Sequence, residues 1–346
     1  MKKLLSLLLC LVMLAALCAC GSTTETKEPA AAEAPAAETA ETEETEAAQP
    51  EEAAQSFTVG ICQLVQHDAL DAATQGFIDV LTEELGDAVT IVNQNAANDI
   101  PTCATIVNGF VSENVDLILA NATPALQAAA SATEDIPVLG TAVTEYGVAL
   151  DIDSFDGTVG GNISGTSDLA PLDQQAAMIT ELFPEAKTAG ILYCSAEANS
   201  VYQAEVVKSA LETAGLTVNI YTFADSNDVA TVTSQACDEC DVLYIPTDNT
   251  AASCTEAINN VAEPAGVPIV AGEAGICSGC GVATLSIDYY ELGRTTGAMA
   301  VRILRDGEDI STMPIEYFPD PVKQYNPELC DALGVTVPED YTAIEG

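Results

Sequence analysis

One pattern constrains the fold of this 346-residue chain more than any other: a short apolar run that ends in polar residues and leads directly into a helical pattern. Residues 242–245 read VLYI and are followed by Pro-Thr-Asp-Asn-Thr. The same order recurs after residues 117–120 (LILA) and after residues 191–194 (ILYC). Such runs are typical of buried parallel strands, and open parallel sheets bind ligands at the carboxyl ends of their strands. The sequence therefore predicts several strand-end loops that converge on one small molecule.

Alternating strand and helix patterns occur in two arrays, which indicates βαβ units and parallel sheets. A helical pattern at residues 289–305 and a β-like pattern at residues 314–320 follow the second array. We therefore expect an α/β fold with two Rossmann-like lobes, residues 57–163 plus 287–318 and residues 164–286 plus 319–346. A cleft between two such lobes suits hinge-bending closure around a small ligand.

Three short segments are expected to connect the lobes as a hinge. Glycines cluster in residues 157–165, residues 284–288 suggest a return crossing, and residues 314–320 suggest a third.

Two local predictions concern helix starts. Asp68 is expected to cap the first helix, and Ser200 with Gln203 is expected to form a capping box.

The N-terminus has the pattern of an export signal. Lys2 and Lys3 precede an apolar stretch at residues 4–17, which is too short for a comfortable membrane-spanning helix. The following Leu-Cys-Ala-Cys-Gly resembles the bacterial lipobox, and Cys20 is the expected lipid acceptor because a small residue precedes it. We expect a signal peptide at residues 1–20 and a lipid-anchored protein on the outer face of a bacterial cell membrane. The alternative is a secreted protein cleaved nearby.

Residues 21–55 predict a disordered acidic tether. They contain ten Glu, one Lys and no large apolar residue. Such a segment cannot bury enough surface to fold.

The net charge is −44, from 53 Asp and Glu against nine Lys and Arg. This charge repels nucleic acid and anionic lipid headgroups, so neither is an expected partner, and membrane association would depend on the lipid anchor alone. We interpret the acidity itself as a solubility trait rather than a functional surface. A monomer is expected.

Nine of the twelve cysteines follow residue 55, and four of them form two CxxC pairs, Cys237 with Cys240 and Cys277 with Cys280. We expect small buried side chains, with disulfides and a four-thiolate zinc site as weaker alternatives. No metal or cofactor is therefore predicted. A surface sensor or redox protein that uses the CxxC thiols remains an alternative function.

No catalytic motif is present. The chain lacks a GxSxG elbow, an HExxH pair and a GxxxxGK[ST] loop, and its single histidine, His67, has no marked nucleophile to serve. The sequence therefore predicts a binding protein rather than an enzyme.

Seven stretches, in order along the chain, together resemble the substrate-binding lipoproteins of an ABC-transporter family that is often associated with aromatic amino acids, tryptophan in particular. They are residues 66–73, 122–125, 141–144, 161–169, 196–200, 246–250 and 287–294. The resemblance implies a type I periplasmic-binding-protein fold with three crossings. It also implies that ligand is delivered to a membrane permease driven by a cytoplasmic ATPase. Ala69, residues 145–154 and the Cys277–Cys280 insert depart from the family pattern.

A free amino acid needs donors for its carboxylate, an acceptor for its ammonium group and a pocket for its side chain. Thr123, Thr141 and Thr144 are candidate carboxylate donors at strand ends, although each could merely cap a helix or close a turn. Asp248 is the preferred ammonium acceptor, and its alternative role is to cap the following helix. The remaining candidates are Glu197 and Asp288 as competing acceptors, Asn199, Thr247 and Asn249 for orienting hydrogen bonds, and His67 and Tyr289 as further ligand contacts.

Two classes of ligand therefore fit the sequence, one of them better than the other. An amino acid, aromatic by the family resemblance, is preferred. A sugar or nucleoside bound by the same fold ranks lower, because sugar pockets favour stacking aromatics and the chain has no Trp.

Overall fold

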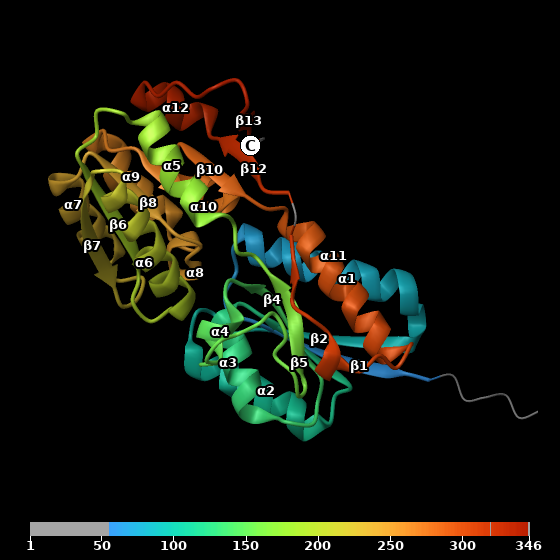
Figure 1. The fold of residues 1–346 in the computed structure, drawn as a ribbon. Coiled ribbons are helices and arrows are strands. Elements are labelled where there is room, and N and C mark those ends of the chain that lie inside the picture. The colour runs from blue at the N-terminus through green and yellow to red at the C-terminus, as the bar shows by residue number, and fades with distance from the viewer. Residues whose placement is uncertain (1–54, 319, 345–346) are drawn as a thin grey trace, which may run out of the picture. The chain divides into compact units, whose positions relative to one another are not determined.

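The computed structural model describes residues 55–318 and 320–344 (Figure 1). The expected signal peptide and all of the expected tether except Gln55 lie outside these residues. The described residues belong to one compact unit. Within the described ranges, no helix combines the length and apolar character that crossing a membrane requires.

The first lobe is built on a six-stranded sheet in the order β11-β5-β4-β3-β1-β2, in which all paired strands are parallel. The strands are β1 (Phe57–Gln63), β2 (Val89–Asn95), β3 (Leu117–Asn121), β4 (Val138–Val143), β5 (Ile163–Ser167) and β11 (Glu316–Tyr317). The helices of this lobe are α1 (Asp68–Leu85), α2 (Ile100–Glu113), α3 (Thr123–Ala132), α4 (Tyr146–Ala149) and α11 (Tyr289–Leu304), with short 3₁₀ helices η1 (Gly86–Ala88) and η2 (Ile310–Thr312).

Two hydrophobic clusters fill the space on either side of this sheet. Phe77 of α1 and Met299 of α11 pack in one cluster with Val59 and Ile61 of β1. Phe110 of α2 packs in the other cluster. The buried positions of α1 recur at helical spacing, so one apolar face of this helix packs against the sheet.

The second lobe is built on a seven-stranded sheet in the order β13-β12-β10-β9-β8-β6-β7. The strands are β6 (Thr188–Cys194), β7 (Thr217–Phe223), β8 (Val242–Ile245), β9 (Ile269–Ala271), β10 (Ala283–Ser286), β12 (Val322–Tyr325) and β13 (Thr342–Ala343). Only the pair of β10 and β12 is antiparallel among the pairs described. The helices are α5 (Leu172–Leu182), α6 (Ala198–Thr213), α7 (Val229–Glu239), α8 (Asn249–Ala252), α9 (Thr255–Ala265), α10 (Ala274–Cys280) and α12 (Pro327–Leu333).

The prediction of two Rossmann-like lobes is confirmed, but the positions of the hinge segments differ from those expected. β5 pairs with β4, so the first change of sheet follows Ser167 rather than residue 163. Residues 284–286 belong to β10, and the return to the first lobe follows them directly. The stretch 314–320 is not one strand, because β11 ends at Tyr317 in the first sheet and β12 begins at Val322 in the second. Figure 1 shows these connections between the two lobes.

Both helix-start predictions were wrong by a few residues. His67, not Asp68, is the N-cap of α1, and its extended backbone contributes no side-chain cap. Glu197 is the N-cap of α6, which places Ser200 inside the first turn rather than in a capping box. The side chains of Ser200 and Gln203 are therefore free to reach β8 and its loop instead.

The nine cysteines that follow residue 55 carry free thiols, and seven of them are buried. Burial raises the pKa of the Cys277 and Cys280 thiols, which disfavours the thiolate that redox chemistry needs. In the described part of the chain, no group of three or more His, Cys, Asp or Glu side chains is arranged to hold a metal ion. The seven buried cysteines therefore pack as small apolar side chains, whereas Cys237 and Cys254 are partly exposed.

Candidate functional site

The carboxyl ends of the two sheets face each other, and loops that follow them are in contact. His67, after β1, places Nε2 3.2 Å from Oδ1 of Asn249, which follows β8. Asn98, after β2, donates from Nδ2 to Oγ1 of Thr250 at 3.1 Å. The strand-end loops therefore converge as predicted, and the lobes are joined by side chains as well as by the hinge.

A second set of contacts joins the lobes near the hinge. We call this set the polar cluster; its members are Thr144, Asp168, Asn199, Gln203, Thr247 and Tyr289. Tyr289 donates from its hydroxyl to Asp168 Oδ2 at 3.0 Å. Gln203 donates to Thr144 Oγ1 at 3.5 Å and accepts from the Thr247 backbone N–H at 3.1 Å. Asn199 donates to the Thr247 carbonyl oxygen at 2.9 Å.

Two hydroxyl groups of the cluster also affect the pKa of a neighbour, although no hydrogen bond of normal geometry joins either pair. The Thr247 hydroxyl lowers the pKa of Tyr289, against the larger effect of burial. The Thr144 hydroxyl likewise lowers the pKa of Asp168, which burial raises. Because Thr144 and Asp168 belong to the first lobe and its hinge, and Gln203 and Thr247 to the second, the polar cluster spans the two lobes.

Two acceptors in the polar cluster have no donor. Asp168 Oδ1 and Asn199 Oδ1 are buried and unpartnered, and the two residues are each only 4% exposed. A buried acceptor without a partner costs about 1–3 kcal/mol, so such atoms need an explanation. Burial raises the pKa of Asp168, which is the expected result for a carboxylate held away from water without a cation.

The cations of the described residues lie elsewhere. Lys208, Arg294, Arg302, Arg305 and Lys323 form ion pairs with Glu or Asp outside the polar cluster, and Lys187 directly precedes β6, at the amino end of that strand. The cluster therefore presents one acidic side chain and several neutral donors and acceptors, a set that suits an ammonium group.

Asp248 caps the following helix, which was the alternative to the predicted role of ammonium acceptor. Its Oδ1 accepts from the Ala251 N–H at 2.7 Å, and its Oδ2 accepts from the Cys194 N–H and the Ser200 hydroxyl, both at 2.7 Å. Burial and, less strongly, the Glu197 carboxylate raise the pKa of Asp248 to about 8, while these three donors favour the charged form. Both oxygens already have donors, so Asp248 holds α8 to the β6 edge.

Glu197 supports the same helix from the other side. Its carboxylate accepts from the backbone N–H and side chain of both Asn249 and Thr250, at distances of 2.7 to 3.0 Å. Glu197 therefore fixes the amide of Asn249 that meets His67. The carboxylates of Asp248 and Glu197 therefore both hold the loop after β8 in position.

The other predicted residues have separate positions. Thr141 is fully buried and contacts the hydroxyls of Thr166 and Thr296 inside the first lobe. Thr123 is buried at the start of α3. Asp288 is the N-cap of α11 and accepts from the Glu291 N–H at 3.1 Å. Of the predicted set, His67 and Asn249 form a direct contact between the lobes, and Thr144, Asn199, Thr247 and Tyr289 belong to the polar cluster.

Asp168, Gln203 and Asn98 were missed as site residues. Asp168 follows β5 directly and lies in the stretch 161–169 that carries the family resemblance, so the strand-end rule could have found it. Gln203 was assigned to a capping box, and nothing in the sequence marks Asn98.

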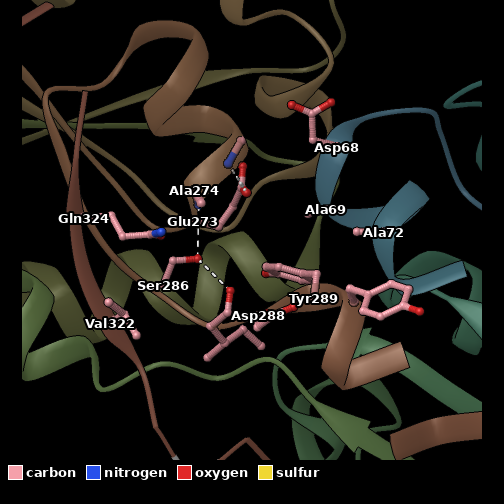
Figure 2. A pocket seen from close by; sticks show the side chains of 13 residues that line it. Asp68, Ala69, Ala72, Glu273, Ala274, Ser286, Asp288, Tyr289, Val322 and Gln324 are labelled. Carbon is pink, nitrogen blue, oxygen red and sulfur yellow. Dashed lines mark hydrogen bonds between the residues drawn. The ribbon is translucent and has the colours of Figure 1, made fainter. Parts of the chain in front are cut away.

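A pocket of about 320 Å³ adjoins the polar cluster at Tyr289 (Figure 2). Figure 2 shows Asp68, Ala69 and Ala72 at the start of α1 on one side, with Val322 and Gln324 of β12 on the other. Glu273 and Asp288 add two further carboxylates to the lining. Burial raises the pKa of Glu273 to about 7, although its oxygens accept from the Gly275 and Ile276 N–H groups. Three carboxylates make this pocket unsuitable for an anionic group.

The fold and the inter-lobe site define a two-lobed substrate-binding protein. Residues 58–344 match the model of the ABC transporter substrate binding protein family, and the chain belongs to this family. Its members are binding proteins rather than enzymes. The fold matches that of type I periplasmic binding proteins, as the resemblance implied.

Relatives with assigned ligands are similar over most of the chain. A tyrosine-binding protein of Clostridioides difficile is 38% identical over 260 residues, which cover 74% of this chain and 75% of that protein. A Streptococcus pneumonia protein solved in complex with L-Trp is 33% identical with a TM-score of 0.80, covering 84% of this chain and all of that one. A ligand-free, open substrate-binding protein of Clostridium difficile is 37% identical with a TM-score of 0.64, covering 84% of this chain and 99% of that one.

Proposed function

We propose that this protein is the extracellular solute-binding component of an ABC importer and captures an aromatic amino acid, tryptophan or tyrosine, between its lobes. The observation that carries the proposal is the pair of buried, unpartnered acceptors in the polar cluster. Their chemistry fits the ammonium group of an amino acid, and relatives at 38% and 33% identity are a tyrosine-binding protein and an L-Trp complex. The ligand would then pass to a membrane permease driven by a cytoplasmic ATPase.

The arrangement of the lobes supports a clamp. The chain superposes better on the L-Trp complex than on the open, ligand-free relative, with TM-scores of 0.80 and 0.64 at similar identity. The contacts of His67 with Asn249 and of Asn98 with Thr250 can form only when the strand-end loops of both lobes approach. Ligand that bridges the lobes would favour this approach, because it binds the closed state better than the open one.

Isothermal titration calorimetry on the purified protein tests the ligand class. We expect saturable binding of L-tryptophan or L-tyrosine and no heat with D-ribose, inosine or L-glutamate. The last of these is a useful control, because an acidic side chain is disfavoured by a protein of net charge −44. Binding of the sugar or the nucleoside, with none of the aromatic amino acids, would replace the proposed ligand class.

We propose further that Cys20 carries the lipid anchor, that residues 21–55 form the tether, and that the protein works as a monomer on the outer face of the cell membrane. The Cys20→Ala variant is expected to appear in the culture medium rather than in the membrane fraction. Cys18→Ala is the matched control and should stay with the membrane, because bulky Leu17 precedes Cys18. Membrane retention of Cys20→Ala would contradict the assignment.

A further inference from the structure

We propose that Cys62 and Cys103 are a redox pair, which a disulfide-containing oxidant converts into a disulfide bond that fastens the end of β1 to the start of α2. The structure shows the reduced form, in which both thiols are free. Neither residue belongs to a CxxC pair, so the sequence did not mark them. The inference concerns a covalent modification within the first lobe and does not depend on the proposed ligand.

The two side chains face each other where β1 packs against α2. Gly60 of β1 lies against Phe110 of α2, because a Cβ at Gly60 would come within 2.6 Å of the phenyl ring. Cys62 is two residues further along the strand, so its side chain points to the same face of the sheet. Cys103 precedes Phe110 by about two helical turns and shares its face of α2. This register sets Cys62 against Cys103, and both belong to one hydrophobic cluster.

The contact extends to the sulfur atoms. The Cys62 sulfur lies 3.9 Å from the carbonyl oxygen of Cys103, and both residues are 0% exposed. The interaction of the two thiols is the largest cause of the change in the pKa of each, lowering that of Cys103 and raising that of Cys62. Cys103 is therefore the better nucleophile of the pair, unlike Cys277 and Cys280, whose pKa is raised by burial.

Thiol–disulfide exchange supplies the oxidation, with a small disulfide such as oxidised glutathione as the electron acceptor. The Cys103 thiolate attacks one sulfur of the oxidant, whose S–S bond breaks, so that a mixed disulfide forms and one thiolate leaves. Cys62 then gives up its proton and attacks the Cys103 sulfur, and the second thiolate leaves. The protein loses two electrons and two protons, and the oxidant gains them as two thiols. Because both sulfurs are buried, the first attack takes place during folding or after the first turn of α2 has opened.

The bond would fasten two loops that reach the second lobe. Cys62 closely precedes the loop that carries His67, and Cys103 closely follows the loop that carries Asn98, and both of these loop residues contact the loop after β8. The two loops are already joined by a hydrogen bond from the Asn98 N–H to the Leu64 carbonyl oxygen at 2.9 Å. A covalent link also restricts the unfolded chain, which stabilises the folded state.

Peptide mapping of the full-length protein tests the bond. Cleavage after Asp and Glu places the two cysteines on separate peptides, residues 53–68 and residues 100–113, with one cysteine in each. The protein is refolded from urea with oxidised glutathione, and the remaining thiols are blocked with N-ethylmaleimide before digestion. Mass spectrometry should then find these two peptides linked to each other, and a reductant should separate them. Absence of this linked pair would overturn the inference.

Cys194 provides the matched control. It is a buried cysteine at the end of β6, and its sulfur contacts the Ala224 carbonyl oxygen. Its peptide, residues 186–197, also contains a single cysteine and should stay unlinked. If residues 53–68 are linked to residues 186–197 as often as to residues 100–113, pairing is indiscriminate and the inference fails.

Melting temperatures test whether the bond fastens the fold. The oxidised protein should melt about 4–10 °C above the reduced protein. Cys194→Ala should keep this difference, and Cys103→Ala should abolish it. Equal melting temperatures of the two forms of the unmodified protein, with the linked peptides present, would overturn the stabilising role. If Cys103→Ala fails to fold by circular dichroism, Cys62→Ala takes its place, and a difference that survives loss of either cysteine would assign the effect to another pair.

Discussion

Buried carboxylates near the strand ends differ in what their oxygens contact, and this difference separates structural from ligand-binding roles. Asp248 and Glu197 receive donors at both oxygens, mostly from the loop after β8. Asp168 receives a donor at one oxygen only. The first two residues should therefore matter for folding, and the third for the ligand.

Asp248→Asn is the variant that tests the structural role. The new Nδ2 would face either the Cys194 N–H and Ser200 hydroxyl or the Ala251 N–H, so that a donor meets a donor. We expect the free energy of unfolding to fall by about 1–3 kcal/mol in urea titration. Asp173→Asn serves as the exposed control. Unchanged stability with a large loss of ligand affinity would return Asp248 to the binding role expected from the sequence.

The sequence placed Asp248 at a strand end as a candidate site residue, whereas Asp168 appeared only within the stretch 161–169 of the family resemblance. Asp248 follows β8 and Asp168 follows β5, and each lies next to residues that suit a ligand site. The distinction depends on the donors that tertiary structure brings. The Cys194 N–H at the end of β6 donates to Asp248, whereas no donor forms a hydrogen bond of normal geometry with Asp168 Oδ1, and neither fact has a local signal in the sequence.

At the scale of elements, helices α1 and α11 approach so closely that glycine is required at their crossing. A Cβ at Gly76 would overlap the Tyr290 carbonyl, and a Cβ at Gly293 would overlap the Ala73 carbonyl. Figure 1 shows the two helices side by side. Since Tyr289 begins α11 and His67 precedes α1, this crossing sets the position of two site residues relative to each other.

Gly293→Ala should therefore destabilise the protein. The added methyl group meets backbone rather than a movable side chain, so we expect a loss of about 1–3 kcal/mol in the free energy of unfolding. Gly109→Ala on α2 is the control, because no atom lies within 4 Å of the added Cβ. That control should gain about 0.5–1 kcal/mol from helix propensity alone. Equal effects at both positions would show that the close approach has no energetic consequence.

Elements with strong local patterns were predicted well, and those that depend on pairing were not. The run at residues 242–245 matches β8 residue for residue, and the run at residues 191–194 forms the second half of β6, since continuous apolar residues define both. β11, β12 and β13 have only two to four residues each, and their burial shows no alternation that periodicity could detect. The hinge position was misplaced for the same reason: β5 belongs to the first sheet through its pairing with β4.

At the scale of the whole molecule, the acidity has a buried component. The net charge is −44, and two of the acidic side chains, Asp248 and Glu273, are buried with their pKa raised to about 8 and about 7. Burial lowers the pKa of His67, which favours its neutral form. His67 and the ordinary carboxylates should therefore lower the stability of the protein as pH falls, whereas the two buried acids should lower it as pH rises from about 4 to about 8.

The effect of rising pH gives the sharper prediction. An acid whose pKa is higher in the folded than in the unfolded state contributes stability that is complete below the unfolded pKa of about 4, declines above it, and is fully lost once pH passes the folded pKa. For Glu273 and Asp248, whose folded pKa values are about 7 and about 8, the loss therefore runs from about pH 4 up to about pH 7 and about pH 8. We expect the free energy of unfolding to decrease over this interval by up to about 1.4 kcal/mol per pH unit for each group. Glu273→Gln should flatten the decrease near its lower end, whereas Glu256→Gln, an exposed carboxylate on α9, should leave it unchanged. Urea titrations at constant ionic strength measure the slope, and a stability that rises over the interval would mean that the donors around Asp248 and Glu273 outweigh their burial.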